Sequence, residues 1–197
     1  MRTEIIESIK ESFDNAYFLV TPNLGKDIGG KLALIDLYLF LGIKSSYIVM
    51  LHDKQSLHSV YGESWKSELF KVFDVNNLPK ILDLFRDPAV GIVGTKKWIV
   101  NEYDAGTDNF INNDQMSKKL CKRFHISIQN YDFIGGTMFW IRSSVIEKFF
   151  RKNDPILIRG ELESGNVMDS HGESLTHTWE RMFSWIAAND GYRVDGI

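Results

Sequence analysis

The stretch "YIVMLHDKQS", residues 47–56, joins five apolar or aromatic residues directly to a polar tip, His52-Asp53-Lys54. A short apolar run of this kind is typical of a buried β-strand, and no turn residue separates it from the tip. Open α/β sheets bind ligands beyond the carboxyl ends of their strands, so we expect the tip to face a ligand. His52 and Asp53 could bind a divalent ion, and Lys54 could contact a diphosphate. The alternative is a solvated turn with a hydrogen-bonded histidine.

The rest of the chain alternates strand-length apolar runs with amphipathic stretches, which predicts an α/β layering. Further strands are expected at residues 16–20, 90–95, 132–143 and 192–194. Helices are expected around residues 5–13 and at residues 29–42, 64–73, 78–85, 117–124, 143–152 and 173–188. We expect the helix at 29–42 to be covered on both sides and the helix at 143–152 to have a serine N-cap. Residues 101–113 are the expected loop and candidate lid, and residues 158–172 are expected to be irregular.

The composition indicates one domain with a single core. The chain has 197 residues, 44% of them hydrophobic, which is long enough for one sizeable core and short for two. Its net charge of -3 gives no basic surface for nucleic acid, and no run of apolar residues is long enough to predict a membrane span. Cys121 is the only cysteine, which excludes an internal disulfide and fits the reducing cytoplasm. The last residues, "GYRVDGI", look like the start of a strand, so we expect a domain that continues into a longer polypeptide.

A second candidate site is "TPNLGKDIGGK", residues 21–31, which follows an expected strand and opens a helix. Glycines allow a ligand to approach the backbone, and a helix N-terminus attracts phosphate oxygens. Asn23, Lys26 and Asp27 add hydrogen-bond donors and acceptors. The stretch lacks the Gly-Lys-Ser/Thr of a P-loop and the three-glycine spacing of Rossmann folds, so an ordinary capped turn is the alternative.

A third candidate site is "HGESLTHTWER", residues 171–181. On a helix, Glu173, His177 and either Glu180 or Arg181 share one face because they lie three or four residues apart. His177 could complete a metal site with His52, and Glu173 could act as a base or stabilise a sugar cation. In the alternative, this face is solvated and the aromatic residues of the helix pack inward.

Two adjacent glycines, Gly135 and Gly136, interrupt the aromatic strand "FIGGTMFWIRSS". Glycine in a strand costs on the order of 1 kcal/mol relative to alanine, so the pair needs a physical reason. Close passage of a sugar ring is one reason, and a β-bulge is the other.

Taken in order, these pieces resemble a known family. They are an "N-x-G-x-D-I-G" loop, a strand ending in His-x-Lys, a "GG-x-M-F-W-x-R" strand, and an "L-x-H-x-x-E-R-x-F" helix followed by "GYRV". This order is similar to that of the rhamnan-synthesis F family of polysaccharide glycosyltransferases, from Ala16 to Val194. The likeness extends to a virus-encoded member, and a viral chain would act in the host cytoplasm.

The resemblance implies a glycosyltransferase domain over residues 1–197. The implied fold is a single GT-A-like α/β domain with a central mixed β-sheet flanked by α-helices. The implied partners are a UDP-linked hexose donor, of the glucose or rhamnose type, and a hydroxyl group of a glycan acceptor. The implied cofactor is Mn²⁺ or Mg²⁺. Where GT-A enzymes have Asp-x-Asp the chain has His52-Asp53-Lys54, so either His52 and Asp53 bind the metal with His177, or Lys54 partly replaces it.

The resemblance also suggests roles for individual residues. The residues assigned to the nucleotide are Thr21, Pro22, Asn23, Lys26 and Asp27, and those assigned to the sugar are Gly135, Gly136 and Thr137. Catalysis is assigned to Glu173 and Lys54, and Glu161 and Asp169 are the alternatives to Glu173. Two other classes of function stay open. A sugar nucleotidyltransferase would release pyrophosphate from a nucleoside triphosphate. A non-catalytic carbohydrate-binding module is mildly supported by the five tryptophans, which stack on sugars.

Overall fold

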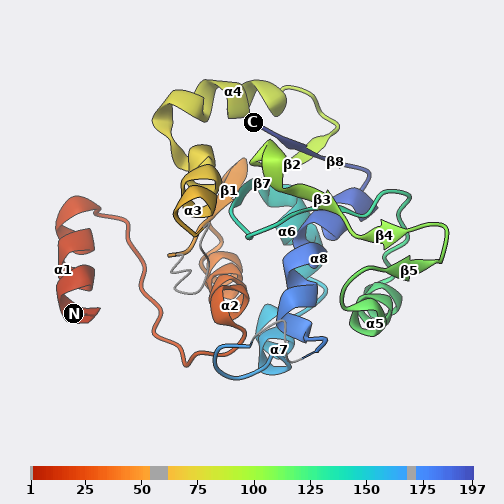
Figure 1. The fold of residues 1–197 in the computed structure, drawn as a ribbon. Helices are drawn as coiled ribbons and strands as arrows, with labels where there is room; N and C mark the ends of the chain where they lie inside the picture. Colours follow the sequence, from red (N-terminus) through yellow and green to blue (C-terminus); the bar gives the residue numbers. More distant parts are fainter. Residues whose placement is uncertain (1, 54–61, 168–171) are drawn as a thin grey trace.

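The fold is built on a mixed four-stranded β-sheet (Figure 1). The computed structural model describes residues 2–53, 62–167 and 172–197. The strand order is β1 (Tyr47–Met50), β7 (Phe139–Arg142), β2 (Val90–Gly94) and β8 (Arg193–Gly196). β7 is antiparallel to both of its neighbours, whereas β2 and β8 are parallel. β1, β2 and β8 therefore point the same way, and their carboxyl ends share one edge of the sheet.

Helices cover both faces of this sheet because apolar side chains alternate between the faces along each strand. α2 (Lys26–Leu41), α6 (Ser143–Phe150) and α8 (Leu175–Asn189) lie on one face, and α3 (Gly62–Phe70) and α4 (Leu78–Leu84) lie on the other (Figure 1). Ile92 of β2 is buried in the core of the first face, and the next residue, Val93, in the core of the second. The expected α/β layering and the mixed sheet are confirmed.

The remaining elements lie outside this framework of sheet and covering helices. The helical ones are α1 (Arg2–Ser12), η1 (Lys71–Phe73), η2 (Val75–Asn77), η3 (Lys96–Trp98), α5 (Asp114–Phe124) and α7 (Pro155–Gly160). The strands are β3 (Ile99–Asn101), which pairs with β6 (Asp132–Ile134), and β4 (Tyr103–Asp104), which pairs with β5 (Asn109–Phe110). Among the helices of the described ranges, none has the length and apolar character needed to cross a membrane.

Residues 16–20 do not form the expected strand. This segment runs as irregular chain between α1 and α2, and Tyr17, Leu19 and Val20 are exposed (Figure 1). An apolar run becomes a strand only where a neighbouring strand completes its backbone hydrogen bonds. The four-stranded sheet of the described residues ends at β1, without this segment.

Two expectations about helices were also wrong in detail. α2 begins at Lys26 and leaves Leu34 and Phe40 exposed, so it is not covered on both sides. α6 has Arg142 as its N-cap residue. The first residue of α6, Ser143, donates its hydroxyl hydrogen to the carbonyl oxygen of Ser45 instead of capping the helix.

Three segments hold more structure than the sequence predicted. The stretch at 132–143 is two strands in different sheets, because the chain turns at the two glycines between β6 and β7. The loop at 101–113 contains the β4–β5 hairpin. The segment at 158–172 begins inside α7, where the Asp154 carboxylate caps the helix by accepting from the backbone N–H groups of Ile156 and Leu157.

Candidate functional site

A cavity of about 230 Å³ lies beside the carboxyl end of β1. Its walls come from the start of α2, the residues after β1, α3, the turn before β7, and the first turns of α8. The lining residues are Lys26, Asp27, Ile28, His52, Trp65, Gly136, Thr137, Thr176, His177 and Glu180. The three stretches singled out in the sequence and one of the two adjacent glycines therefore meet at one place.

The strand register explains why His52 and Thr137 meet in this cavity. β1 and β7 are antiparallel, and Met50 stands opposite Phe139. Continuing this register by two residues past the end of β1 leads to His52 on one chain segment and Thr137 on the other. The apolar run at 47–51 thus ends in a polar tip because the chain there leaves the sheet and enters the cavity wall.

The buried ammonium group of Lys31 connects three of the lining residues. Its Nζ lies 2.8 Å from Asp27 Oδ2, 3.0 Å from His52 Nδ1 and 3.1 Å from Thr137 Oγ1. Asp27 and Lys31 are one helical turn apart on α2, so the i,i+4 spacing places both on the same face. Because Lys31 is only 3% exposed, its charge is desolvated and these three contacts replace water.

This environment shifts the pKa values of both members of the ion pair. Burial alone would raise the pKa of Asp27, but the charges of Lys31 and His52 and the hydrogen bonds from Lys31 and Thr137 outweigh it and lower the pKa from 3.8 to about 2. Burial lowers the pKa of Lys31, and the nearby Asp27 carboxylate opposes this effect. We expect both groups to be charged at neutral pH because the two charges stabilise each other at 2.8 Å.

The turn between β6 and β7 holds Thr137 in an unusual backbone conformation. Gly136 has a φ of 83° and Thr137 a φ of 51°, and a positive φ is unfavourable for a β-branched residue. The Thr137 hydroxyl donates to Asp27 Oδ2 at 2.5 Å, so the turn delivers a side chain to the Lys31 cluster. A Cβ atom on Gly136 would meet Leu69 Cδ1 at 2.7 Å and displace that side chain, and the positive φ also favours glycine. Gly135 lies in the same turn, so the β-bulge alternative is wrong.

The N-terminus of α2 also faces the cavity. Its first three residues, Lys26, Asp27 and Ile28, are all lining residues. The first backbone N–H groups of a helix have no carbonyl partner within the helix, and the helix dipole makes this end positive. Gly25 and Lys26 both have positive φ values, 69° and 51°, which bend the chain into the helix start. The arrangement favours an anionic group at this wall.

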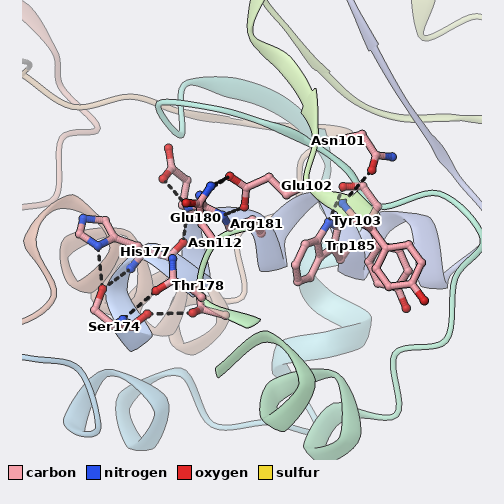
Figure 2. A network of polar contacts seen from close by, with 12 residues as sticks. Asn101, Glu102, Tyr103, Asn112, Ser174, His177, Thr178, Glu180, Arg181 and Trp185 are labelled. Atoms are coloured by element: carbon pink, nitrogen blue, oxygen red, sulfur yellow. Dashed lines mark hydrogen bonds and ion pairs between the residues drawn. The ribbon is translucent and has the colours of Figure 1, made fainter. Parts of the chain in front are cut away.

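The opposite wall is the start of α8, where Thr176, His177 and Glu180 share the inward face. Glu180 Oε1 accepts from the backbone N–H of Gly136 at 2.6 Å, which ties α8 to the strained turn. Figure 2 shows the ring of His177 beside Ser174, whose Oγ lies 2.7 Å from His177 Nδ1. The alternative of a fully solvated helix face is therefore wrong, although the aromatic residues of α8 do pack inward.

A buried ion pair fixes the position of α8. The guanidinium group of Arg181 makes two hydrogen bonds of 2.8 Å to the Glu102 carboxylate, and both side chains are 9% exposed (Figure 2). Arg181 also donates to Glu180 Oε2 at 2.9 Å and to the carbonyl oxygen of His177 at 2.7 Å. The loop at 101–113 thus has a structural role, because its Glu102 orients the helix that carries three cavity residues.

A second cavity of about 440 Å³ adjoins the first through Glu180, which lines both. Its other lining residues include Asn112, Glu173 and Arg181. The Glu173 carboxylate accepts from the backbone N–H groups of Gln115 and Met116 at 3.2 and 2.9 Å, so it caps α5. Of these two glutamates, Glu180 lines the first cavity and Glu173 does not.

Several of the other predicted site residues lie outside the first cavity. Asp53 is 70% exposed and lies 3.9 Å from Lys66, and Glu161 pairs with Arg123. Four more predicted residues are described but do not line the first cavity: Thr21, Pro22, Asn23 and Gly135. Lys54 and Asp169 lie outside the described residues. Of the five residues predicted to contact the nucleotide, Lys26 and Asp27 line the cavity.

The predicted metal ligands do not form a metal site in the part of the chain that the structure describes. No group of three or more His, Cys, Asp or Glu side chains there could hold a metal ion. His52 and His177 line the cavity without Asp53. The Asp27 carboxylate, 3.5 Å from His52 Nδ1, already binds the Lys31 ammonium. The divalent ion and its ligands therefore stay a prediction.

Sequence reasoning missed Lys31, Trp65 and Glu180 as parts of the site. Lys31 was detectable in principle, because it is a charged residue on a largely apolar helix, four residues after Asp27. Glu180 shares a helix face with His177 and was passed over in favour of Glu173. Trp65 is brought to the cavity only by the packing of α3, where it contacts Trp98 with ring centroids 5.5 Å apart.

Comparisons with known proteins identify one family. The family model described as rhamnan synthesis protein F matches residues 1–192. No curated protein matches the chain, and no solved structure does. The GT-A part of the fold expectation therefore stays a prediction.

Proposed function

We propose that this chain, which belongs to the rhamnan synthesis protein F family, is a glycosyltransferase. Membership of this family indicates a role in polysaccharide synthesis. The proposed reaction moves a hexose of the glucose or rhamnose type from a UDP-linked donor to a hydroxyl group of a glycan acceptor. The observation that carries the proposal is that the N-terminus of α2, the Lys31 cluster and Glu180 meet around one cavity at the carboxyl edge of the sheet.

The α2 wall suits the diphosphate of the donor. Its backbone N–H groups and the Lys26 side chain favour negative oxygens. A volume of 230 Å³ is below the range of about 300–1,000 Å³ that encloses a drug-sized ligand, so this cavity suits the diphosphate and sugar rather than the whole donor. Trp65 offers an aromatic face for stacking on a ring of the donor.

The proposed chemistry needs charge stabilisation and a base. The bond between the anomeric carbon and the diphosphate oxygen breaks, the acceptor oxygen bonds to that carbon, and the acceptor proton passes to a base. Negative charge grows on the departing UDP, where the start of α2 and Lys26 stabilise it. The protein supplies these positive groups in fixed positions before the reaction begins.

Glu180 is our candidate for the carboxylate near the reacting carbon. It lines both cavities, so a donor in the first and an acceptor in the second would meet beside it. The Gly136 N–H and Arg181 hold its two oxygens, which keeps the carboxylate oriented. It could accept the acceptor proton or stabilise positive charge on the sugar.

A panel of UDP, GDP, CDP and dTDP, each with and without Mn²⁺, tests the proposal by thermal shift. A bound diphosphate should raise the melting temperature, with about 2.7 kcal/mol of stabilisation at a hundredfold excess over its dissociation constant. Lys26→Met should reduce this response. Lys44→Met, which changes an exposed lysine that follows the C-terminal end of α2 and does not line the cavity, is the matched control and should not.

Assays of the released products distinguish the classes of enzyme. A glycosyltransferase releases UDP from UDP-glucose or UDP-rhamnose when an acceptor is present. Release of pyrophosphate from a nucleoside triphosphate would instead favour the nucleotidyltransferase. No thermal response to any nucleoside diphosphate would contradict the proposal.

A further inference from the structure

The contact between Lys31 and His52 determines where the imidazole carries its hydrogen. Lys31 Nζ lies 3.0 Å from His52 Nδ1. An ammonium group has three donors and no acceptor, so Nδ1 must be the acceptor and can carry no hydrogen. In a neutral imidazole the hydrogen is then on Nε2.

Three contacts fix the position of the Lys31 ammonium group. Its three N–H donors meet three acceptors, which belong to Asp27, His52 and Thr137. All three partners line the cavity, whereas Lys31 itself does not. The strained turn holds Thr137, and Thr137 in turn donates to Asp27. Lys31 cannot rotate away from His52 without leaving a buried charge unsatisfied.

We propose that Lys31 is a positioning residue that holds His52 as the Nε2–H tautomer, so that the ring serves as a hydrogen-bond donor to an anionic oxygen of the bound diphosphate. The donor role rests on the function proposed above, whereas the tautomer follows from the Lys31 contact alone. Lys31 acts through His52, Asp27 and Thr137 rather than by touching the ligand.

The same tautomer makes His52 a poor metal ligand. A histidine binds a metal through the lone pair of an unprotonated ring nitrogen. Here the Nδ1 lone pair accepts from Lys31 and Nε2 carries the hydrogen. In this chain the cation beside His52 is the ammonium group of Lys31, which is part of the fold.

Nuclear magnetic resonance of the full chain, labelled with ¹⁵N in its histidines, tests the tautomer directly. The His52 signals are identified by their loss in His52→Gln. We expect an unprotonated Nδ1 and a protonated Nε2 in the wild type. In Lys31→Met the hydrogen should move toward Nδ1, where Asp27 Oδ2 lies 3.5 Å away. A hydrogen on Nδ1 of wild-type His52 would overturn the proposal, and this spectrum decides even if Lys31→Met fails to fold.

Two substitutions of His52 separate a hydrogen-bond donor from a metal ligand, with UDP as the probe in titrations with and without Mn²⁺. Glutamine can accept from Lys31 and still donate to a phosphate, so His52→Gln should keep the dissociation constant within about threefold. Glutamate has only acceptors, so His52→Glu should weaken binding by about tenfold or more. If His52→Glu instead still binds UDP and needs Mn²⁺ to do so, while His52→Gln loses UDP binding, then His52 is a metal ligand and the proposal is overturned. If wild-type protein binds no nucleoside diphosphate, the donor role fails together with the proposed function, and the spectrum still decides the tautomer.

Discussion

At the scale of single residues, the charge on Lys31 depends mainly on one carboxylate, that of Asp27, with a smaller contribution from Glu180. Asp27 is the only acidic partner within 4 Å among the contacts described for the Lys31 ammonium group. The pKa of Asp27 is lowered to about 2, which favours its charged form, whereas burial lowers the pKa of Lys31, which disfavours its charged form. The two pKa shifts together mean that the cluster depends on an ionised Asp27.

We therefore predict that Asp27→Asn destabilises the protein in a pH-dependent way. The variant leaves a buried ammonium group without its counter-charge, which costs about 3 kcal/mol at neutral pH. The folded-state pKa of Asp27 is depressed, so its contribution is present above about pH 4 and is lost as the pH falls through about 2. The difference in unfolding free energy between wild type and variant should therefore shrink by about 1 kcal/mol at about pH 3. Urea unfolding at both pH values measures this.

Asp83→Asn is the matched control for the Asp27 prediction. The Asp83 carboxylate is exposed and pairs with Arg86 at 2.9 Å, so its removal should cost about 0.5 kcal/mol or less. An equal loss in both variants, or a loss in Asp27→Asn that does not change with pH, would show that the Lys31 cluster does not contribute as described.

For catalysis, we predict that Glu180→Gln lowers the transfer rate and leaves the affinity for UDP nearly unchanged. Glutamine keeps an oxygen for the Gly136 N–H but loses the negative charge. Loss of a general base or charge-stabilising group lowers the rate by about 10²–10⁴-fold. Steady-state rates with UDP-glucose or UDP-rhamnose, and UDP titrations, measure the two effects separately.

Glu173→Gln is the control because Glu173 was the carboxylate that the sequence favoured. It caps α5, so its replacement should lower stability modestly and leave the transfer rate close to that of the wild type. If Glu173→Gln loses the rate and Glu180→Gln keeps it, the sequence-based choice was right.

At the scale of elements, the position of α8 depends on contacts at both sides of its first turns. The Glu163 carboxylate accepts from the backbone N–H groups of Leu175 and Thr176 at 2.6 and 3.0 Å. Burial would raise the pKa of Glu163, but the Thr176 hydroxyl and the backbone N–H groups lower it. Glu102 holds the next turn through Arg181. The cavity face of α8 is therefore oriented from two separate loops.

We predict that Glu102→Gln destabilises the protein far more than Glu161→Gln. Both carboxylates make two hydrogen bonds to an arginine, but Glu102 and Arg181 are 9% exposed, whereas Arg123 and Glu161 are 41% and 44% exposed. Breaking a buried pair costs about 3–5 kcal/mol, and an exposed pair contributes about 1 kcal/mol or less. Chemical unfolding of the two variants measures the contrast, and equal losses would show that burial does not decide the contribution of the pair.

Elements with strong local patterns could be predicted from the sequence. The helices at α2, α5 and α8 and the strands β1 and β2 follow from apolar periodicity within one window. The irregular structure of residues 16–20 could not be predicted, because their pattern is that of a strand. They are irregular because no strand of the described residues pairs with them. We predicted a single strand through Gly135 and Gly136, where the chain in fact turns. The turn could not be predicted because distant residues set the pairing of β3 with β6, and of β7 with β1 and β2.

At the scale of the whole molecule, the site is assembled from segments between Lys26 and Glu180. The sequence identified three of these segments. Two carry polar residues after an apolar run, and the third carries polar residues at helical spacing. The sequence could not identify the pairing inside the site, where Lys31 contacts His52. Those contacts depend on the antiparallel register of β1 and β7, which no local pattern encodes.

The arrangement of the whole molecule also predicts that α1 contributes little to stability. α1 lies apart from the layered helices (Figure 1), and Ile5, Ile9 and Phe13 are 54%, 37% and 65% exposed. Little apolar surface is buried there, so a variant lacking residues 1–12 should melt within about 3 °C of the wild type and keep its response to UDP. Ile35→Ala, in the buried face of α2, is the control and should cost about 2–5 kcal/mol. A fall of about 10 °C or more in the shortened variant would show that α1 buries its apolar face in solution, against the arrangement seen here.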